Sequence, residues 1–394
     1  GVLALVDASS LIDAMPALSV RLPGSVGVGE TIDVDVRIVP RASRRVALTL
    51  RCETRGSLDA GADVELATEG RPLDGSLPVT APCRGPGELT AVWVRASGRL
   101  GLLHRIERVT AEAATKVLPS LEAVRRLAMT QRASDGRGGA PTTLRRHGSG
   151  TEFDEVQPYS AGMDTRAIDW KASARHGELR VRRFRLEQHQ RIVVMLDTGR
   201  AMIEHTAGLA RIDHGIHTGL ALAQVALANG DQVALHAYGV RPRAWVPPGS
   251  GVRHLRKLTR VVAELHAEER ESNPVHAVRD LMSRLNRRSI VVVISDLHDA
   301  TSTELMTEAL QSLARSHLVV LVALADDDTR DPLAQPPATM EAVARSLVLH
   351  DLARERARAL ERLEGCGAHV LSSPPGLAAT QLMKRYLELK RRLG

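Results

Sequence analysis

The sequence predicts an N-terminal antiparallel β-sandwich followed by a doubly wound, mainly parallel α/β domain. Two changes of pattern along the chain indicate this fold class. From about Leu18 to Val117, hydrophobic and polar residues alternate, which is the period of half-buried strands. From Ile192 onward, short and nearly continuous apolar runs alternate with longer helical stretches, as in a parallel sheet covered by helices on both faces.

The composition is that of a soluble globular protein with a bias towards anionic partners. The 394 residues are enough for two or three domains, and 43% of them are hydrophobic and 25% charged. The net charge of +7 favours acidic protein surfaces, lipid headgroups or nucleic acid as partners, without choosing among them. No run of 18 apolar residues occurs, so no segment is expected to span a membrane.

The three cysteines, Cys52, Cys83 and Cys366, lie far apart in the sequence and form no C-x-x-C pair. This spacing argues against a zinc ribbon or a redox motif. Cys52 and Cys83 could pair if they faced each other, but a chain of this size does not need disulfides. We expect reduced core thiols.

Short strands separated by Gly/Pro turns indicate the sandwich. Residues 31–39 and 89–94 alternate cleanly, and turns such as Gly85-Pro86-Gly87 lie between the strand candidates. We assign residues 18–118 to an immunoglobulin-like sandwich and residues 119–147 to a connector. We expect the sandwich to serve as a scaffold or an interaction domain.

The C-terminal half alternates strands and helices. The strand candidates are residues 192–196, 232–238, 243–246, 290–295, 318–325 and 369–371. The helix candidates are residues 213–228, 252–265, 274–285, 303–315, 340–363 and 377–392. We assign residues 191–394 to this α/β domain, with Asp213 as a candidate N-cap of its first helix.

Two carboxylates, Asp197 and Asp296, follow apolar strands of this predicted sheet. If the strands are neighbours, the pair converges at the edge where ligands bind in open α/β sheets. Hard oxygen ligands of this kind suit Mg²⁺ or Mn²⁺. The alternative is that both aspartates serve as turn or cap residues.

The order of these motifs resembles a von Willebrand factor A domain, whose metal-ion-dependent adhesion site begins Asp-x-Ser-x-Ser. Gly199 and Ala201 occupy the two serine positions here, and the third element falls near Ser272-Asn273. The resemblance therefore implies a degenerate metal site. Its candidate ligands are Asp197, Asn273 and Asp296.

A dense run of charges around a tryptophan, Tyr159-Ser-Ala-Gly-Met-Asp-Thr-Arg-Ala-Ile-Asp-Trp-Lys-Ala-Ser-Ala-Arg175, fits neither a plain amphipathic helix nor a strand. The run resembles the signature of domain-of-unknown-function family 58. The residues that meet the family pattern are Tyr159, Gly162, Arg166, Ile168, Trp170, Ala174 and Arg175. We assign residues 148–190 to this signature segment.

The resemblance implies a sandwich followed by a von Willebrand factor A-like domain, usually behind two N-terminal transmembrane helices. It also implies a MoxR-type AAA+ ATPase as partner. Residues 1–17 would then be membrane-proximal, with Gly1–Val6 the remnant of the second helix. The native protein would lie at the cell membrane with its soluble region facing the cytoplasm.

Within the signature, the spacing of Asp164 and Arg166, and of Asp169 with Lys171 or Arg175, suits local ion pairs. We expect these pairs and a buried Trp170 ring to pin the segment across the junction of sandwich and sheet. The alternative is a recognition surface in which arginine and tryptophan act as hot spots.

The sequence favours a non-enzymatic adaptor or chaperone-like binding module. The motifs G-x-S-x-G, G-x-x-x-x-G-K-[ST] and H-E-x-x-H do not occur. We expect the partner to bind a rim formed by Asp197–Met202, Ser272–Asn273 and Asp296–Asp299. The rim residues expected to make contact are Thr198, Arg200, Ser272, His298 and Asp299.

Two other functions remain open. The basic stretch Arg180–Arg185 could bind nucleic acid or an anionic membrane, although acidic residues such as Glu178 lie close by and make nucleic acid the less favoured partner. An unrecognised hydrolase is the third reading, because Ser295, Asp296 and His298 contain the residue types of a triad without evidence of its geometry.

Overall fold

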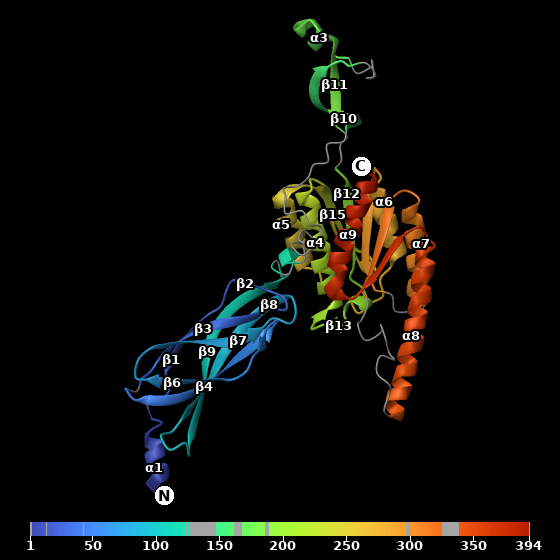
Figure 1. Ribbon diagram of the computed structural model, residues 1–394. Helices are drawn as coiled ribbons and strands as arrows, with labels where there is room; N and C mark the ends of the chain where they lie inside the picture. Colours follow the sequence, from blue (N-terminus) through green and yellow to red (C-terminus); the bar gives the residue numbers. More distant parts are fainter. Residues whose placement is uncertain are drawn as a thin grey trace.

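The computed structural model describes residues 2–12, 14–41, 43–120, 122, 124–126, 147–160, 168–185, 189–296, 300–324 and 339–393. They form a mixed α/β protein, with mainly antiparallel sheets in the N-terminal part and a largely parallel sheet in the C-terminal part (Figure 1). The predicted combination of an antiparallel N-terminal part with a mainly parallel α/β part is therefore confirmed.

The N-terminal part consists of two sheets around one aliphatic core. The four-stranded sheet has the order β1 (Ala17–Arg21), β3 (Thr31–Val39), β7 (Leu73–Thr80) and β5 (Asp59–Ala60). The five-stranded sheet has the order β2 (Ser25–Gly27), β9 (His104–Leu118), β8 (Gly85–Ser97), β4 (Arg45–Gly56) and β6 (Val64–Glu69). The alternation predicts the inner face correctly, since Val34, Val36 and Ile38 of β3 pack with Leu48 and Leu50 of β4 in one buried cluster.

A short helix, α1 (Val2–Ser9), precedes the sandwich and lies at its far end (Figure 1). Within the described residues, no helix is long and apolar enough to cross a membrane. All three cysteines are unbridged; Cys52 is buried and Cys83 is exposed. The thiols are unbridged, as expected, but only Cys52 lies in the core, so the expectation of core thiols is wrong for Cys83 and Cys366.

The C-terminal part contains a six-stranded sheet, in which each neighbouring pair is parallel except the edge pair β15–β16. The strands, in spatial order, are β16 (Pro242–Gly249), β15 (Gln232–Tyr238), β12 (Arg191–Asp197), β17 (Ile290–Ser295), β18 (Leu318–Leu324) and β19 (His369–Ser373). Their almost wholly buried apolar sequences reflect helices on both faces.

Alternate residues of β12 enter two different cores. Val194 and Leu196 pack with α4 (Arg211–Ala228), α5 (Gly251–Ala263) and α9 (Pro375–Leu393). On the other face, Val193 and Met195 pack with α6 (Pro274–Arg284), α7 (Ala300–Ala314) and the end of α8 (Met340–Glu364).

Every predicted helix of this part is present, with ends shifted by a few residues. The N-cap prediction for Asp213 is wrong, because α4 begins two residues earlier, after a small hairpin of β13 (His205–Thr206) and β14 (Leu209–Ala210). The backbone N–H of Arg211 bonds to the carbonyl of Glu204, which fixes this early start.

The signature segment forms a separate hairpin. Strands β10 (His147–Pro158) and β11 (Arg180–Arg185) pair antiparallel, and α3 (Trp170–His176) lies between them in sequence. Figure 1 shows this hairpin beyond the end of the α/β part that is remote from the sandwich, so the prediction that the segment is pinned across the junction of sandwich and sheet is wrong.

Candidate functional site

The carboxylate of Asp197, at the end of β12, is the centre of the predicted rim. Its Oδ1 accepts a hydrogen bond from the N–H of Gly199 at 2.8 Å. Its Oδ2 accepts hydroxyl hydrogen bonds from Ser295 at 2.6 Å, Ser272 at 3.0 Å and Tyr238 at 3.4 Å. These donors come from four different segments, so one buried side chain ties the strand ends and loops of this edge together.

Burial and hydrogen bonding act on the Asp197 carboxyl in opposite directions. The residue is 2% exposed, and this burial raises its pKa, while the hydroxyl of Ser295 and the other donors lower it. Burial also raises the pKa of the Tyr238 phenol well above its usual value, so this hydroxyl stays a donor. The site is dry, hydrogen-bonded and organised around one acid.

Backbone hydrogen bonds fix the loops around this acid. The Thr198 hydroxyl donates to the carbonyl of Tyr238 at 2.9 Å, and the N–H of Glu268 donates to the Thr198 carbonyl at 2.8 Å. The N–H of Arg200 donates to the carbonyl of Arg270 at 3.0 Å. Asn273, a predicted metal ligand, instead caps α6 by accepting from the N–H of His276.

Asp296 belongs to a different set of contacts, although β12 and β17 are neighbours as predicted. Leu196 is level with Ile294 in the sheet, which places Asp197 level with Ser295 and Asp296 one residue further. Because side chains alternate between faces, Asp296 turns to the α4 face. There its carboxylate contacts Arg211 at 2.6 Å and Arg356 at 2.8 Å.

The described residues of this edge do not fit a divalent cation. A cation needs oxygen ligands that converge on one point. Asp197 is committed to four protein donors, Asn273 caps a helix, and Asp296 faces away between two guanidinium groups. Within the described chain, no cluster of three or more His, Cys, Asp or Glu side chains is placed to hold a metal ion.

The exposed part of the rim is charged. The Arg200 side chain is 69% exposed and lies 3.9 Å from the carboxylate of Glu271, which is 56% exposed. Ser272 is engaged by Asp197, as described above. Thr198 is fully buried, so the prediction that it contacts the partner is wrong. Two further residues of the predicted contact set, His298 and Asp299, lie outside the described residues.

The signature segment does not show the predicted burial. Trp170 is 69% exposed, so the prediction of a buried ring is wrong. The physical reason is local: Asp169 caps α3 by accepting from the N–H groups of Lys171 and Ala172, which places Trp170 on the first, outward-facing turn. Tyr159 is half-buried and Arg175 exposed, while Gly162, Asp164 and Arg166 lie outside the described residues.

A buried joint between sandwich and α/β part was not predicted. The Arg84 guanidinium, just before β8, pairs with the Asp213 carboxylate of α4 and donates to the carbonyl of Val262 at 2.6 Å. Nearby, the N–H of Ser120 donates to Nε2 of His217 at 3.1 Å. Arg84 and Asp213 are 129 residues apart, and only the fold brings them together.

Comparison with known proteins gives a family match but no activity. Residues 155–334, somewhat less than half of the chain, match the model of a family described as a protein of unknown function, DUF58. No curated protein matches the chain.

Several solved structures are weakly similar. BatB from Bacteroides thetaiotaomicron, a conserved hypothetical protein, has a TM-score of 0.37 and 10% identity over 52% of this chain and 99% of that chain. A CARDB domain from Pyrococcus furiosus has a TM-score of 0.20 and 14% identity, over 26% of this chain and 90% of that chain. An uncharacterised membrane-spanning protein from Vibrio fischeri has a TM-score of 0.19 and 9% identity, over 51% of this chain and 99% of that chain. Similarities of this strength assign no function to the chain.

Proposed function

We propose that this protein is a non-enzymatic adaptor that binds another protein through the rim of its six-stranded sheet. The observation that carries the proposal is the Asp197 hydrogen-bond centre, which holds the rim loops in one arrangement. A preorganised surface loses little entropy on binding, which favours affinity. The fold is proposed to be of the von Willebrand factor A type, as the order of its motifs implies.

The burial of the acids at this edge supports binding over catalysis. Asp197 is 2% and Asp296 is 4% exposed, and both carboxylates are engaged by protein donors. A general base or nucleophile must reach its substrate, directly or through a water. The exposed rim instead offers Arg200, a residue type common in binding hot spots.

As partner we propose a MoxR-type AAA+ ATPase, which the resemblance of the signature segment implies. Because the rim acids do not fit a cation, the contact is proposed to be metal-free. Within the described residues, the side chain of Arg200 has only a long, exposed ion pair with Glu271, so it can exchange this pair for an acidic group of the partner at small cost.

The test is binding of a purified MoxR-type AAA+ ATPase from the same organism, measured by biolayer interferometry. We expect Arg200→Glu to weaken binding at least about tenfold, the effect of losing one good charged contact. Arg253→Glu, on the exposed side of α5, is the matched charge reversal and is expected to bind like wild type. EDTA is expected to have no effect. Equal binding by Arg200→Glu and wild type would refute the proposal that the partner binds at the rim. Sensitivity of binding to EDTA would refute the proposal that the contact is metal-free.

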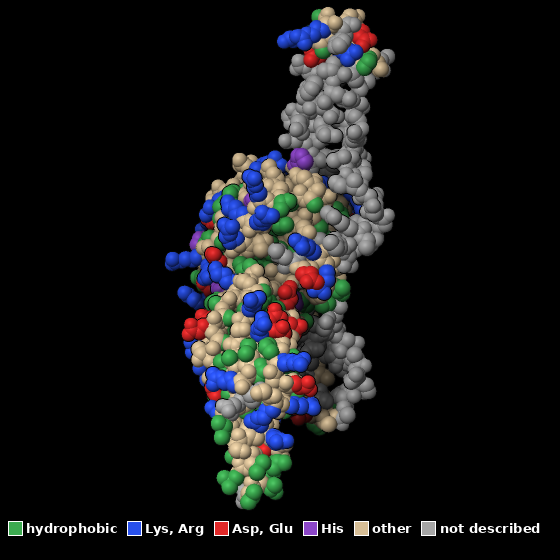
Figure 2. All heavy atoms as spheres, turned by 90° about the vertical axis from the view of Figure 1, so that its left-hand side faces the viewer, with side chains coloured by type: hydrophobic (Ala, Val, Ile, Leu, Met, Phe, Trp, Pro, Cys, Tyr) green, Lys and Arg blue, Asp and Glu red, His purple; other side chains and the backbone are tan. Residues whose placement is uncertain are grey.

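We further propose that the far end of the sandwich lies against a membrane. Exposed apolar side chains gather there on α1 and just after it, and on the turn between β8 and β9 and the start of β9. They form the green cluster at the lower end of Figure 2. They are Val2, Leu3, Leu5, Val6, Ile12, Leu100, Leu102, Leu103 and Ile106. Contiguous apolar surface of this kind marks a protein or membrane contact. The neighbouring cations Arg99 and Arg105 suit anionic headgroups.

Flotation with vesicles of phosphatidylcholine and phosphatidylglycerol tests this placement. We expect the wild-type protein to float with the vesicles. The triple variant with Leu100, Leu102 and Leu103 changed to serine should float much less, because insertion of these side chains supplies the apolar free energy. The control changes Leu347 and Val348, two exposed apolar residues of α8, to serine. Equal loss in the control, or flotation unchanged in the triple variant, would contradict the placement.

A further inference from the structure

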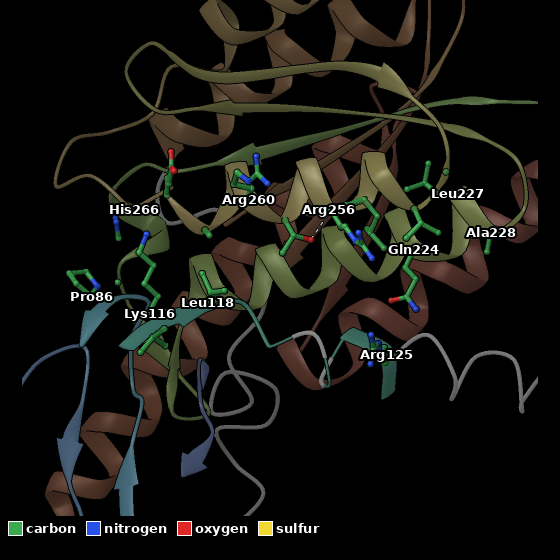
Figure 3. Close-up of a pocket in the computed structure, with 18 residues that line it drawn as sticks. Pro86, Lys116, Leu118, Arg125, Gln224, Leu227, Ala228, Arg256, Arg260 and His266 are labelled. Carbon is green, nitrogen blue, oxygen red and sulfur yellow. Dashed lines mark hydrogen bonds between the residues drawn. The ribbon is translucent and has the colours of Figure 1, made fainter. Parts of the chain in front are cut away.

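A pocket of about 900 Å³ lies between the sandwich and the helices α4 and α5. Figure 3 shows its two sides: the strand ends carrying Pro86, Lys116 and Leu118 on one, and the two helices on the other. This volume is within the range of small-molecule sites in proteins.

Helix α5 faces the pocket along one stripe. Residues 252, 255, 256, 259, 260 and 263 line it, a spacing of three and four residues that defines one helix face. Leu258 and Val262, which lie between these positions, are buried against the sheet instead. The α5 helix therefore has a second, outward face, and this face is not covered by the protein core.

The lining is mostly aliphatic. Val252 and Leu255 of α5, Leu227 of α4 and Val117 and Leu118 of β9 contribute apolar surface from three elements. Val252 is 69% exposed, which is unfavourable for an isolated valine in water. An occupant with an aliphatic body would cover this surface.

Cations surround the aliphatic lining. Lys116, Arg125, Arg256 and Arg260 line the pocket, and Glu264 is the one acidic residue among the described lining residues. In the described part of the structure, none of these four cationic side chains forms a hydrogen bond or an ion pair. Four unpaired cations and one acid around an apolar surface favour an anionic ligand.

We propose that this pocket binds an amphipathic organic anion, a medium-chain aliphatic carboxylate, with its chain on the aliphatic lining and its head group at Arg256 and Arg260. Arginine pairs with carboxylates through two parallel hydrogen bonds, which fits this head group. The sandwich already holds the last turn of α5 through Arg84 and the carbonyl of Val262. The ligand would therefore bridge both sides of the joint and raise its stability.

The first experiment is calorimetric titration with decanoate below its micelle concentration. We expect one decanoate per chain and a rise in Tm. Decanol has the same chain without the charge, and acetate has the charge without the chain. Both are expected to bind at least about tenfold more weakly, since each lacks one half of the interaction.

Variants of one helix locate the site. Arg256→Gln and Arg260→Gln are each expected to weaken decanoate about tenfold, as for loss of a charged hydrogen bond. Arg253→Gln and Lys257→Gln remove the same charge from α5 outside the pocket lining and should leave the affinity unchanged. Ala228→Trp, at the exposed end of α4, narrows the pocket and should lower the affinity without removing a charge.

The proposal fails if decanoate does not bind, or if decanol binds as tightly. It also fails if Arg256→Gln and Arg253→Gln have the same effect, because the anion would then respond to surface charge alone. Loss of affinity in Arg256→Gln and Ala228→Trp, with both controls unchanged, would support it.

Discussion

Arg84, at the start of a sandwich strand, and Asp213, in the first turn of α4, form an ion pair in which both side chains are 2–3% exposed. The Arg84 guanidinium also donates to the carbonyls of Val262 and Ala263 at the end of α5, where the helix dipole is negative. Each charge thus has partners that offset the cost of burying it. This contact joins the sandwich to the α/β part.

The first prediction concerns removal of one charge of this pair. Arg84→Met is expected to destabilise the protein by about 3–5 kcal/mol, because it leaves Asp213 buried without its cation. The measurement is the free energy of unfolding in urea at pH 7. Arg51→Gln removes an arginine whose pair with Asp63 is exposed, and it should change little.

A second substitution tests the cause. If the cost is the unpaired acid, the double variant Arg84→Met with Asp213→Leu should recover much of the loss. A double variant whose loss equals the two single losses combined would show no coupling between Arg84 and Asp213, and so would contradict a cost that comes from the unpaired charge.

The second prediction is a pH dependence from His217. Burial lowers the pKa of its imidazole to about 4, against an opposing effect of Asp213 and smaller effects of His214 and Arg84 in the same direction as burial. The Nε2 atom accepts a hydrogen bond from the N–H of Ser120, so the neutral ring is the one that fits. Protonation would break this contact at the joint.

The sign follows from the lowered pKa. Above a pH of about 6.5, which is the pKa of this imidazole in the unfolded chain, the ring is neutral in both the folded and the unfolded protein. The contribution of His217 to the free energy of unfolding is then fully present. As the pH falls from 6.5 towards 4, the unfolded chain binds the proton first, and up to about 3 kcal/mol is lost. Other histidines with lowered pKa, such as His236, act in the same direction. We therefore expect the free energy of unfolding of His217→Gln to depend less steeply on pH than that of wild type. The measurement is urea unfolding of both proteins at several pH values. An identical pH dependence would exclude His217 as its source.

Periodicity predicts most of this fold. The alternation in residues 31–39 predicts which side chains of β3 face the sandwich core, and the apolar runs from Ile192 onward predict each strand of the parallel sheet. Both patterns indicate burial directly, because the position of a residue along its strand decides on which side of the sheet its side chain lies. Helix ends are less well predicted, since the start of α4 depends on a hairpin contact of Arg211 with Glu204.

The arrangement of the rim depends on contacts that no local pattern reports. Asp197 and Asp296 follow neighbouring strands, as predicted, but a difference of one residue in register sends their side chains to opposite faces. Ser295, directly before Asp296, is the residue that bonds to Asp197. The joint at Arg84 is hidden for the same reason: its partners are distant in sequence.

The third prediction concerns how α1 is held. The Asp7 carboxylate accepts from the N–H groups of Leu100, Leu102 and Leu103 at 2.7–2.8 Å, and the bond from Leu100 is the main cause of its lowered pKa. Asp7→Asn places an amide that donates where three donors already converge. We expect α1 to detach, and an N-terminal tag to be released several-fold faster by a protease. Asp33→Asn on β3 is the matched control, and equal release rates would contradict the anchoring role.

The fourth prediction concerns Gly199 and Ala201, the two positions at which the metal motif of von Willebrand factor A domains has serine. Gly199 stands where the related motif has a serine, and a Cβ there would lie 2.8 Å from both the N and the Cβ of Ser272. Ser272 already donates its hydroxyl to Asp197, so it occupies the position that a serine at 199 would need. Overpacking of this kind typically costs about 1–3 kcal/mol.

Gly199→Ser combined with Ala201→Ser is therefore expected to lower Tm and to gain no Mg²⁺ or Mn²⁺ in calorimetric titration, whereas Ala201→Ser alone should be the milder change. Tight metal binding by the double variant with an unchanged Tm would show that the site lacks only its two hydroxyls, and that Ser272 yields its place more readily than this geometry indicates.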